Sequence, residues 1–184
     1  MTTHIETVLD IETLGTARRS VIVAVAAYTF SYGDAPDNTI KVEGTFHEQV
    51  SVLSCLRSGL SVDKSTLEWW QKQPQYVWEM VTAGQKSLRT VLQELSLYIE
   101  SLRGYDREIR VWGYGKDFDQ ALLEDAYEVE GLREPWSYRE SMCLRTVFSF
   151  HGRKWKSKEA HNPLADAAGE AEELKSLIDS FGLE

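Results

Sequence analysis

Two acidic residues one position apart stand near the start of the chain, in the stretch Val-Leu-Asp-Ile-Glu-Thr-Leu-Gly over residues 8–15. The apolar residues around Asp10 and Glu12 predict a β-strand, in which residues i and i+2 point to the same face. Two adjacent carboxylates repel each other unless a cation lies between them. Hard divalent ions such as Mg²⁺ and Mn²⁺ prefer carboxylate oxygens. Taken alone, the stretch fits a metal site and an acidic strand surface equally well.

Three further residues have the chemistry to complete such a site. Asp119 follows a predicted short strand and lies in the first turn of a predicted helix, while His161 and Asp166 flank the start of the last predicted helix. Each has a purely structural explanation when taken singly, because acids at a helix N-terminus complement the helix dipole. A histidine in front of a helix is also a common surface residue. Together with Asp10 and Glu12, however, the three favour a metal-dependent active site.

The elements that must position these residues follow from hydrophobic periodicity and turn residues. Strands are predicted at residues 5–11, 20–32, 39–50, 109–112 and 136–143. Helices are predicted at residues 52–59, 63–78 with an interruption at Pro74, 87–102, 118–129, 144–151 and 162–181, the last with Asn162 as N-cap and Pro163 in the first turn. Three antiparallel strands followed by alternating helices and strands predict an α/β fold with a mixed sheet flanked by helices, as in a ribonuclease-H-like core.

Composition limits the class of protein. A length of 184 residues with 42% hydrophobic and 27% charged residues predicts one globular domain over residues 1–184. Apolar runs fall short of the ~20 residues of a membrane span, and the N-terminus lacks a signal-peptide pattern. We therefore expect no membrane association. Two cysteines indicate a reducing compartment, which favours the cytoplasm.

The net charge of -9 bears on possible partners. Proteins that coat nucleic acid usually need a basic surface to neutralise the phosphates. An acidic chain can still reach a phosphate when metal ions bridge it to the protein carboxylates. The charge therefore argues against a passive nucleic-acid coat and leaves a metal-dependent nuclease open.

Three segments resemble, in order, the motifs of the DEDDh 3′–5′ exonucleases: residues 10–12 (Asp-Ile-Glu), 118–119 (Phe-Asp) and 161–166 (His-Asn-Pro-Leu-Ala-Asp). The resemblance spans most of the chain. Residues 66–70 (Thr-Leu-Glu-Trp-Trp) and 113–115 (Gly-Tyr-Gly) are similar to the branch that contains phage exonuclease A and a mycobacterial 3′–5′ exoribonuclease.

The chain departs from the family pattern at two points. Pro163 stands where ribonuclease T, another member, usually has a small residue that is not proline. Asp117 competes with Asp119 for the second motif. We choose Asp119 because it follows Phe118, and we expect Asp117 to be the helix N-cap.

The resemblance implies a ribonuclease-H-like fold and a hydrolase that releases nucleoside 5′-monophosphates from the 3′ ends of single-stranded RNA or DNA, or from 3′ overhangs. It implies two Mg²⁺ or Mn²⁺ ions and a general base, His161, that takes the proton of the attacking water. The implied metal ligands, which with His161 are the catalytic residues, are Asp10, Glu12, Asp119 and Asp166.

The expected substrate contacts are Thr13, Leu14, Trp69, Trp70, Phe118 and Arg145. Leu14 is expected to wedge against the terminal base, and backbone groups near Thr13 to reach its sugar. We expect one of Trp69 and Trp70 to stack on a base and the other to lie in the core. The basic stretch at residues 152–158 is either a solvated loop or a guide for the phosphate backbone, and we favour the guide.

Several alternatives stay open at this level. Arg18 and Arg19 are equally compatible with a solvated turn and with a phosphate contact. The same fold can carry a catalytically silent binding module or a phosphohydrolase that acts on free nucleotides. The sequence leaves open whether RNA or DNA is preferred, and whether the chain is a monomer or, like many related exonucleases, a homodimer.

Overall fold

A mixed five-stranded sheet forms the centre of the computed structural model, which describes residues 3–32, 41–157 and 161–181. The strands are β1 (Thr3–Thr13), β2 (Ile22–Tyr32), β3 (Lys41–Gln49), β4 (Arg107–Gly113) and β5 (Ser141–Cys143). Their order across the sheet is β3-β2-β1-β4-β5. The first three strands pair antiparallel, whereas β4 pairs parallel to both β1 and β5. The predicted mixed α/β sheet, with three antiparallel strands first, is confirmed.

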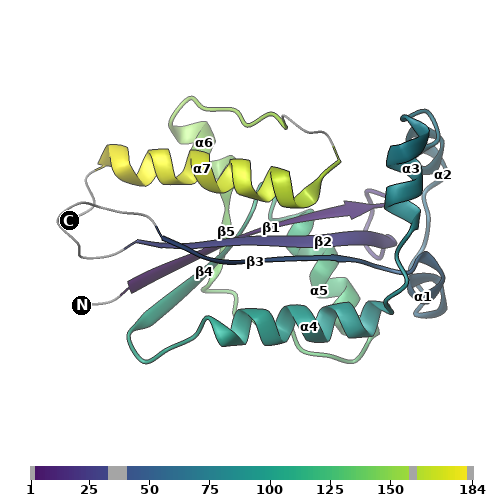
Figure 1. Cartoon of the computed structure of the whole chain (residues 1–184), viewed down its shortest axis with the longest axis horizontal. Coiled ribbons are helices and arrows are strands. Elements are labelled where there is room, and N and C mark those ends of the chain that lie inside the picture. The colour runs from purple at the N-terminus through teal and green to yellow at the C-terminus, as the bar shows by residue number, and fades with distance from the viewer. Residues whose placement is uncertain (1–2, 33–40, 158–160, 182–184) are drawn as a thin grey trace.

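Helices cover both faces of this sheet (Figure 1). They are α1 (Val52–Arg57), α2 (Lys64–Trp70), α3 (Gln75–Thr82), α4 (Leu88–Ser101), α5 (Asp119–Val129), α6 (Leu144–Phe150) and α7 (Pro163–Phe181). Helix α7 lies on one face, and α4 and α5 lie on the other. The short helices α1, α2 and α3 gather at the end of the sheet toward which β1 points.

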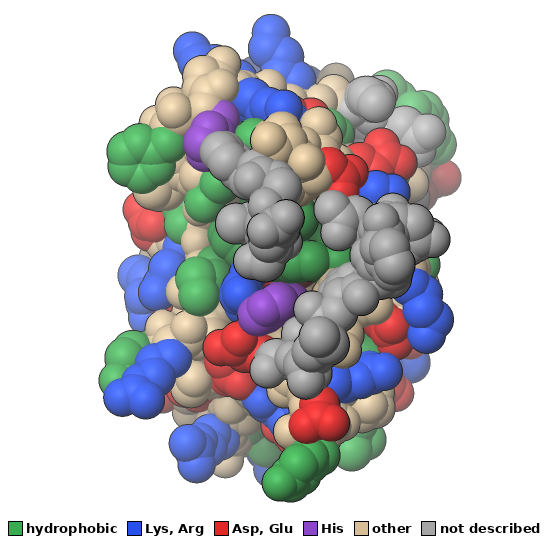
Figure 2. Space-filling view, turned by 90° about the vertical axis from the view of Figure 1, so that its left-hand side faces the viewer, with side chains coloured by type: hydrophobic (Ala, Val, Ile, Leu, Met, Phe, Trp, Pro, Cys, Tyr) green, Lys and Arg blue, Asp and Glu red, His purple; other side chains and the backbone are tan. Residues whose placement is uncertain are grey.

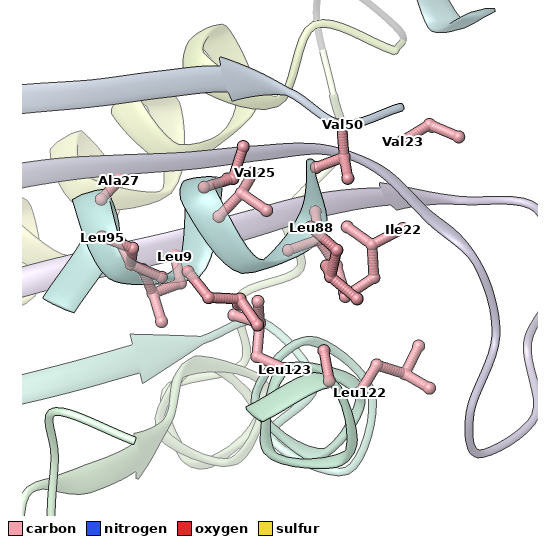
Figure 3. Packing of buried hydrophobic residues seen from close by; sticks show 14 of the residues in the cluster. Leu9, Ile22, Val23, Val25, Ala27, Val50, Leu88, Leu95, Leu122 and Leu123 are labelled. Atoms are coloured by element: carbon pink, nitrogen blue, oxygen red, sulfur yellow. The ribbon is translucent and has the colours of Figure 1, made fainter. Parts of the chain in front are cut away.

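Alternation along β1 separates the two layers of the core. Ile5, Leu9 and Ile11 belong to the cluster that contains the buried residues of α4 and α5, part of which Figure 3 shows around Leu9. Val8, on the other face, belongs to the cluster under α7. Because successive strand residues alternate, Asp10 shares the α7 face with Val8.

Side-chain caps set several helix starts. Ser51, Asp63 and Ser87 each accept a hydrogen bond from the backbone N–H three residues later. The Asn162 side chain accepts one from the N–H of Ala165 at 3.2 Å, which confirms it as the N-cap of α7. The role expected for Asp117 is wrong, since the residue that precedes α5 is Phe118 and its side chain makes no capping bond.

The strand expected over residues 136–143 is shorter than predicted. Residues 137–140 form a turn, in which the Ser137 N–H donates to the Glu140 carboxylate at 2.6 Å and the Glu140 N–H donates back to the Ser137 carbonyl at 3.0 Å. These bonds turn the chain just before β5. The start of the third predicted strand, residues 39–40, and the turn at 33–38 lie outside the described residues.

The end of the molecule that carries the two termini is shown in Figure 2. On the described part of this face, acidic and basic side chains alternate with apolar ones and no large patch of one charge is seen. In the described part of the chain, no helix has both the length and the apolar content of a membrane span.

Candidate active site

The end of β1 and the start of α7 bring three carboxylates together. One side-chain oxygen from each of Asp10, Glu12 and Asp166 lies within 4.8 Å of the others. Central strand β1 is held on both sides by β2 and β4, and its register with β2 shifts between Glu12 and Thr13. Such irregularities re-aim side chains and are common next to active sites. The proximity expected from the sequence is therefore present for these three acids.

Asp119 approaches the same cluster from the first turn of α5. Its side chain is 5% exposed, and the Gly115 N–H donates to its Oδ2 at 3.4 Å. A Cβ atom on Gly113 would lie 3.2 Å from that oxygen, so the glycine leaves room for the carboxylate. Electrostatic repulsion links Asp119 to Asp10 and Glu12. The structure thus brings all four predicted acids into one region.

Burial dominates the electrostatics of this region, and the positive charge of Arg145 only partly opposes it at Asp119 and Glu170. Burial is the largest cause that raises the pKa of Glu12 to about 8 and that of Asp119 to about 6. For Glu12, repulsion from Asp166 and Asp119 adds to the effect. The pKa of Asp10 is also well above its ordinary value, first through burial and then through repulsion from the surrounding acids. Such shifts are typical of functional sites.

Glu6 shows how the same strand face handles a buried acid that is structural. Its side chain is fully buried, yet Arg110 lies 3.1 Å from Oε1 and the Trp112 indole N–H donates to Oε2 at 2.5 Å. A buried charge is tolerated when it is paired and hydrogen-bonded. The fold therefore pairs Glu6 with Arg110 and Trp112, although burial still raises its pKa. Within the described residues, neither Asp10 nor Glu12 has a lysine or arginine in comparable contact.

His161 occupies a constrained position in front of α7. Its φ of 73° is uncommon for a residue other than glycine, and such conformations cluster at functional sites. The imidazole packs edge-on against Trp69 and Trp70, with 4.9 Å between ring centroids in both cases. Its Nδ1 lies 3.9 Å from Glu12 Oε1. Burial lowers the pKa of His161, which outweighs the opposite effect of Asp166, so the ring is neutral at pH 7 and able to accept a proton.

The two tryptophans of α2 have different environments. Trp70 is 2% exposed, and its indole N–H donates to the Thr13 carbonyl at 2.8 Å, so it braces the end of β1. Trp69 is 44% exposed and lies beside His161. Leu14 is 2% exposed within the core. Trp70 is therefore the tryptophan of the pair that lies in the core, which leaves Trp69 as the candidate for stacking. The contact expected between Leu14 and the terminal base stays a prediction.

The other expected substrate contacts lie around this cluster. The hydroxyl of Thr13 donates to the Gly15 carbonyl at 2.6 Å, and half-buried Phe118 packs against the core. Arg145 is exposed and its guanidinium lies over the Tyr114 ring, 5.3 Å from the centroid. A Cβ on Gly115 would be 2.6 Å from Arg145 Nη2, so the glycine gives the guanidinium its space.

The other basic residues singled out in the sequence are of two kinds: some are held by ion pairs, and others are exposed. Arg18 donates from Nε to Asp125 of α5 at 2.7 Å, and the Arg19 N–H donates to the same carboxylate at 2.8 Å, so these contacts anchor the loop after β1. In the basic stretch, Arg153 pairs with Glu173 of α7 at 2.7 Å. The neighbouring Lys154 and Lys156 are exposed, and Lys158 lies outside the described residues.

Glu170 is a residue of this region that the sequence reasoning missed. It lies four residues after Asp166 on α7 and is 2% exposed. Burial, with added repulsion from Asp119 and Asp166, raises the pKa of Glu170 to about 9. Residues four apart share a helix face, so the spacing of Glu170 from Asp166 is the signal by which the sequence could have identified it.

A mixed sheet with acids at the end of its central strand, and a histidine and an aspartate at the start of its last helix, defines the DEDDh class of ribonuclease-H-like exonucleases. A model of the 3′-5′ exoribonuclease Rv2179c-like domain matches residues 6–178. The chain therefore belongs to the 3′-5′ exoribonuclease Rv2179c-like family. This confirms the resemblance found in the sequence. No curated protein matches the sequence.

Solved structures support the fold. The chain is similar to cell-death related nuclease 4 (CRN-4), with a TM-score of 0.64 and 15% identity over 96% of this chain and 64% of that one. It is also similar to the nuclease domain of 3′hExo, a DEDDh family member bound to rAMP, with a TM-score of 0.63 and 10% identity over 96% and 92% of the two chains. A full-length 3′-exonuclease gives a TM-score of 0.60 and 11% identity over 98% and 84%.

The crowded acids predict a distinctive pH dependence of stability. A carboxyl whose pKa is raised on folding binds its proton more tightly in the folded state than in the unfolded one. Its contribution to stability is complete below the unfolded pKa of about 4, and it is lost as the pH rises through the folded pKa. For Asp119, Glu12 and Glu170 these folded values are about 6, 8 and 9. His161, with its lowered pKa, acts in the opposite direction but only below about pH 6.5.

We therefore expect the metal-free protein to lose about 3 kcal/mol or more of stability between pH 6 and pH 9. This corresponds to a fall of about 6–12 °C in melting temperature for a chain of this size. Scanning calorimetry in a chelating buffer measures it. Millimolar Mg²⁺ at constant ionic strength should restore most of the loss, and a melting temperature that is flat across this pH range without metal would contradict the prediction.

Proposed function

We propose that this chain is a divalent-metal-dependent 3′–5′ exonuclease that removes nucleoside 5′-monophosphates one at a time from the 3′ end of single-stranded RNA. The observation that carries the proposal is the group of three carboxylates within 4.8 Å at the end of β1, with His161 beside it. Membership in the exoribonuclease family favours RNA over DNA. The rAMP bound to the 3′hExo nuclease domain is a nucleoside monophosphate of the kind that we expect as product.

The donor set fits Mg²⁺ or Mn²⁺. All of the converging ligand atoms are carboxylate oxygens, which hard divalent ions prefer over other side chains. Asp10, Glu12 and Asp166 would hold the metal, with Asp119 completing a site for two ions. Bound there, the ions would lower the pKa of the attacking water and stabilise charge on the leaving 3′-oxygen. Their positive charge would also compensate the buried acids.

His161 is proposed as the general base. Its neutral imidazole accepts the proton of the attacking water at the nitrogen that faces the acids, which is Nδ1 in this structure. The edges of Trp69 and Trp70 hold the ring in place and reduce its contact with solvent. The lowered pKa keeps the base unprotonated near neutral pH.

Trp69 is the proposed stacking surface for a base near the 3′ end. Stacking on an exposed aromatic side chain contributes about 1–3 kcal/mol per base. We expect Trp69→Ala to raise KM for an RNA strand by about 5-fold or more, with the melting temperature close to that of the wild type. Steady-state kinetics on a labelled strand measures the change.

Trp70→Ala is the contrasting variant. Trp70 lies in the core and hydrogen-bonds to Thr13, so its truncation should cost about 3–5 kcal/mol of stability. An unchanged KM in Trp69→Ala would contradict the stacking role.

Three basic side chains are candidates for contacts with the phosphates of the RNA strand outside the active site. Arg145 is close enough for its charge to act on Asp119. Lys154 and Lys156 are exposed in the basic stretch that Arg153 ties to α7. These three side chains are proposed phosphate contacts. We place the enzyme in the cytoplasm, because Cys55 and Cys143 are both free thiols.

The decisive experiment compares matched RNA and DNA single strands labelled at the 5′ or the 3′ end, with Mn²⁺ or with a chelator. With Mn²⁺, a 3′ label should appear at once as a mononucleotide, while a 5′-labelled strand shortens one nucleotide at a time. RNA should be degraded faster than DNA. Binding without release of mononucleotides would identify a silent module, and hydrolysis of free nucleotides alone would identify a phosphohydrolase.

A further inference from the structure

Glu170 stands apart from the other buried acids of the molecule. Its side chain is 2% exposed, and among the described residues its Oε2 has no hydrogen-bond partner. Glu6, which is buried to the same degree, is bonded to Arg110 and Trp112. Leaving a buried polar atom unpaired costs free energy, and a buried unpaired charge costs more. The position of Glu170 therefore calls for a compensating group.

The surroundings of Glu170 indicate where that group binds. On α7 it lies one turn after Asp166, on the same helix face. Repulsion from Asp119 and Asp166 acts on its carboxyl group, which in turn repels Asp10. Arg145 provides the opposing positive charge, but its side chain is exposed and held over Tyr114. The buried carboxylate thus faces the acidic cluster from the α7 side.

We propose that Glu170 is a fifth carboxylate of the metal centre and a positioning residue for it. Its negative charge, and a hydrogen bond that Oε2 would accept from a metal-bound water, would raise the affinity of the centre for divalent metal. The proposal rests on the proposed function, because it assumes that the four predicted acids bind Mg²⁺ or Mn²⁺. Outer carboxylates of this kind orient the ligands of a metal site and tune its affinity.

The test is the substitution Glu170→Gln, which preserves shape and removes the carboxyl group that would carry this negative charge when metal binds. Mn²⁺ binding to the full chain is measured by isothermal titration calorimetry, and independently by the Mn²⁺ concentration that gives half of the maximal rise in melting temperature. Both should show an affinity about 10-fold or more below that of the wild type. The Mn²⁺ concentration for half-maximal turnover should rise by the same factor in Glu170→Gln. At saturating Mn²⁺, the turnover of this variant should recover most of the wild-type value.

Two controls separate this role from a structural one. Glu172→Gln removes a carboxylate that is exposed on the same helix, and it should leave Mn²⁺ affinity unchanged. The metal-free Glu170→Gln protein should melt at or above the wild-type temperature, because an unpaired buried acid is gone. A reduced affinity accompanied by a lower metal-free melting temperature would assign Glu170 to packing and overturn the proposal.

The failure of this inference and that of the proposed function give different results. Wild-type Mn²⁺ affinity in Glu170→Gln, together with metal binding and exonuclease activity in the wild-type protein, would overturn the role of Glu170 alone. Absence of Mn²⁺ binding to the wild-type protein would overturn the metal centre and the inference with it.

Discussion

Replacing Asp10 by asparagine is expected to abolish exonuclease activity and, at the same time, to stabilise the metal-free protein. Asp10 provides one of the three converging carboxylates, so its loss removes a proposed metal ligand at the end of the central strand. We expect turnover to fall about 1,000-fold or more, equivalent to ~4 kcal/mol of transition-state stabilisation. Rates on a labelled RNA strand at saturating Mn²⁺ measure the loss.

The stability gain follows from the electrostatics of the same residue. Burial and repulsion from Asp119, Glu170, Glu12 and Asp166 raise the pKa of Asp10, so its ionisation on raising the pH costs free energy in the folded state. Asparagine removes that cost. The metal-free variant should melt about 2–4 °C above the wild type at pH 8–9, and close to it below about pH 4, the ordinary pKa of an aspartate.

Glu6→Gln is the matched control on the same face of β1. Glu6 is compensated by Arg110 and Trp112, so neutralising it leaves a partly buried arginine without its counter-ion. This variant should lose stability and keep most of its activity, the reverse of Asp10→Asn. A metal-free Asp10→Asn protein that melts below the wild type at pH 8–9 would contradict the interpretation of the acidic cluster.

Replacing His161 is expected to reduce turnover by about 100- to 10,000-fold, the range in which a positioned general base contributes. His161→Asn is the informative variant, because asparagine tolerates the φ of 73° better than most residues and has no group that accepts a proton near neutral pH. His161→Ala removes the same base. KM should change little, since the loss falls on a step after binding.

A measurement of metal affinity distinguishes the loss of the general base from damage to the metal site. The carboxylates of Asp10, Glu12 and Asp166 do not depend on His161 for their placement, because they belong to β1 and α7. Mn²⁺ affinity measured by calorimetry should therefore stay within about 3-fold of the wild-type value. Wild-type turnover in His161→Asn would refute the assignment of the general base.

Much of the site could be predicted because its residues sit in strongly patterned elements. The alternation of β1 places Asp10 and Glu12 on one face whatever the rest of the fold does. The N-cap of α7 is likewise local, since Asn162 bonds to Ala165 within its own first turn. The error at Asp117 has a local cause too, because α5 begins one residue later than the capping pattern suggested.

Burial could not be predicted in the same way. Trp69 and Trp70 are neighbours with the same side chain, and only the packing of α2 against the end of β1 makes one a brace and the other an exposed surface. Leu14 follows the acidic pair directly, yet the fold packs its side chain into the core.

The chain's sequence by itself determined the order of the elements, the identity of the four acids and the histidine, and the family to which they belong. These depend on residue type and on periods of two or 3.6 residues, which are local properties. The tertiary structure decided which buried acids are compensated: Glu6 is paired by strand β4, whereas Glu170 faces Asp119 and Asp166. That distinction depends on contacts between residues far apart in the chain, because desolvation and charge pairing arise only when the layers pack.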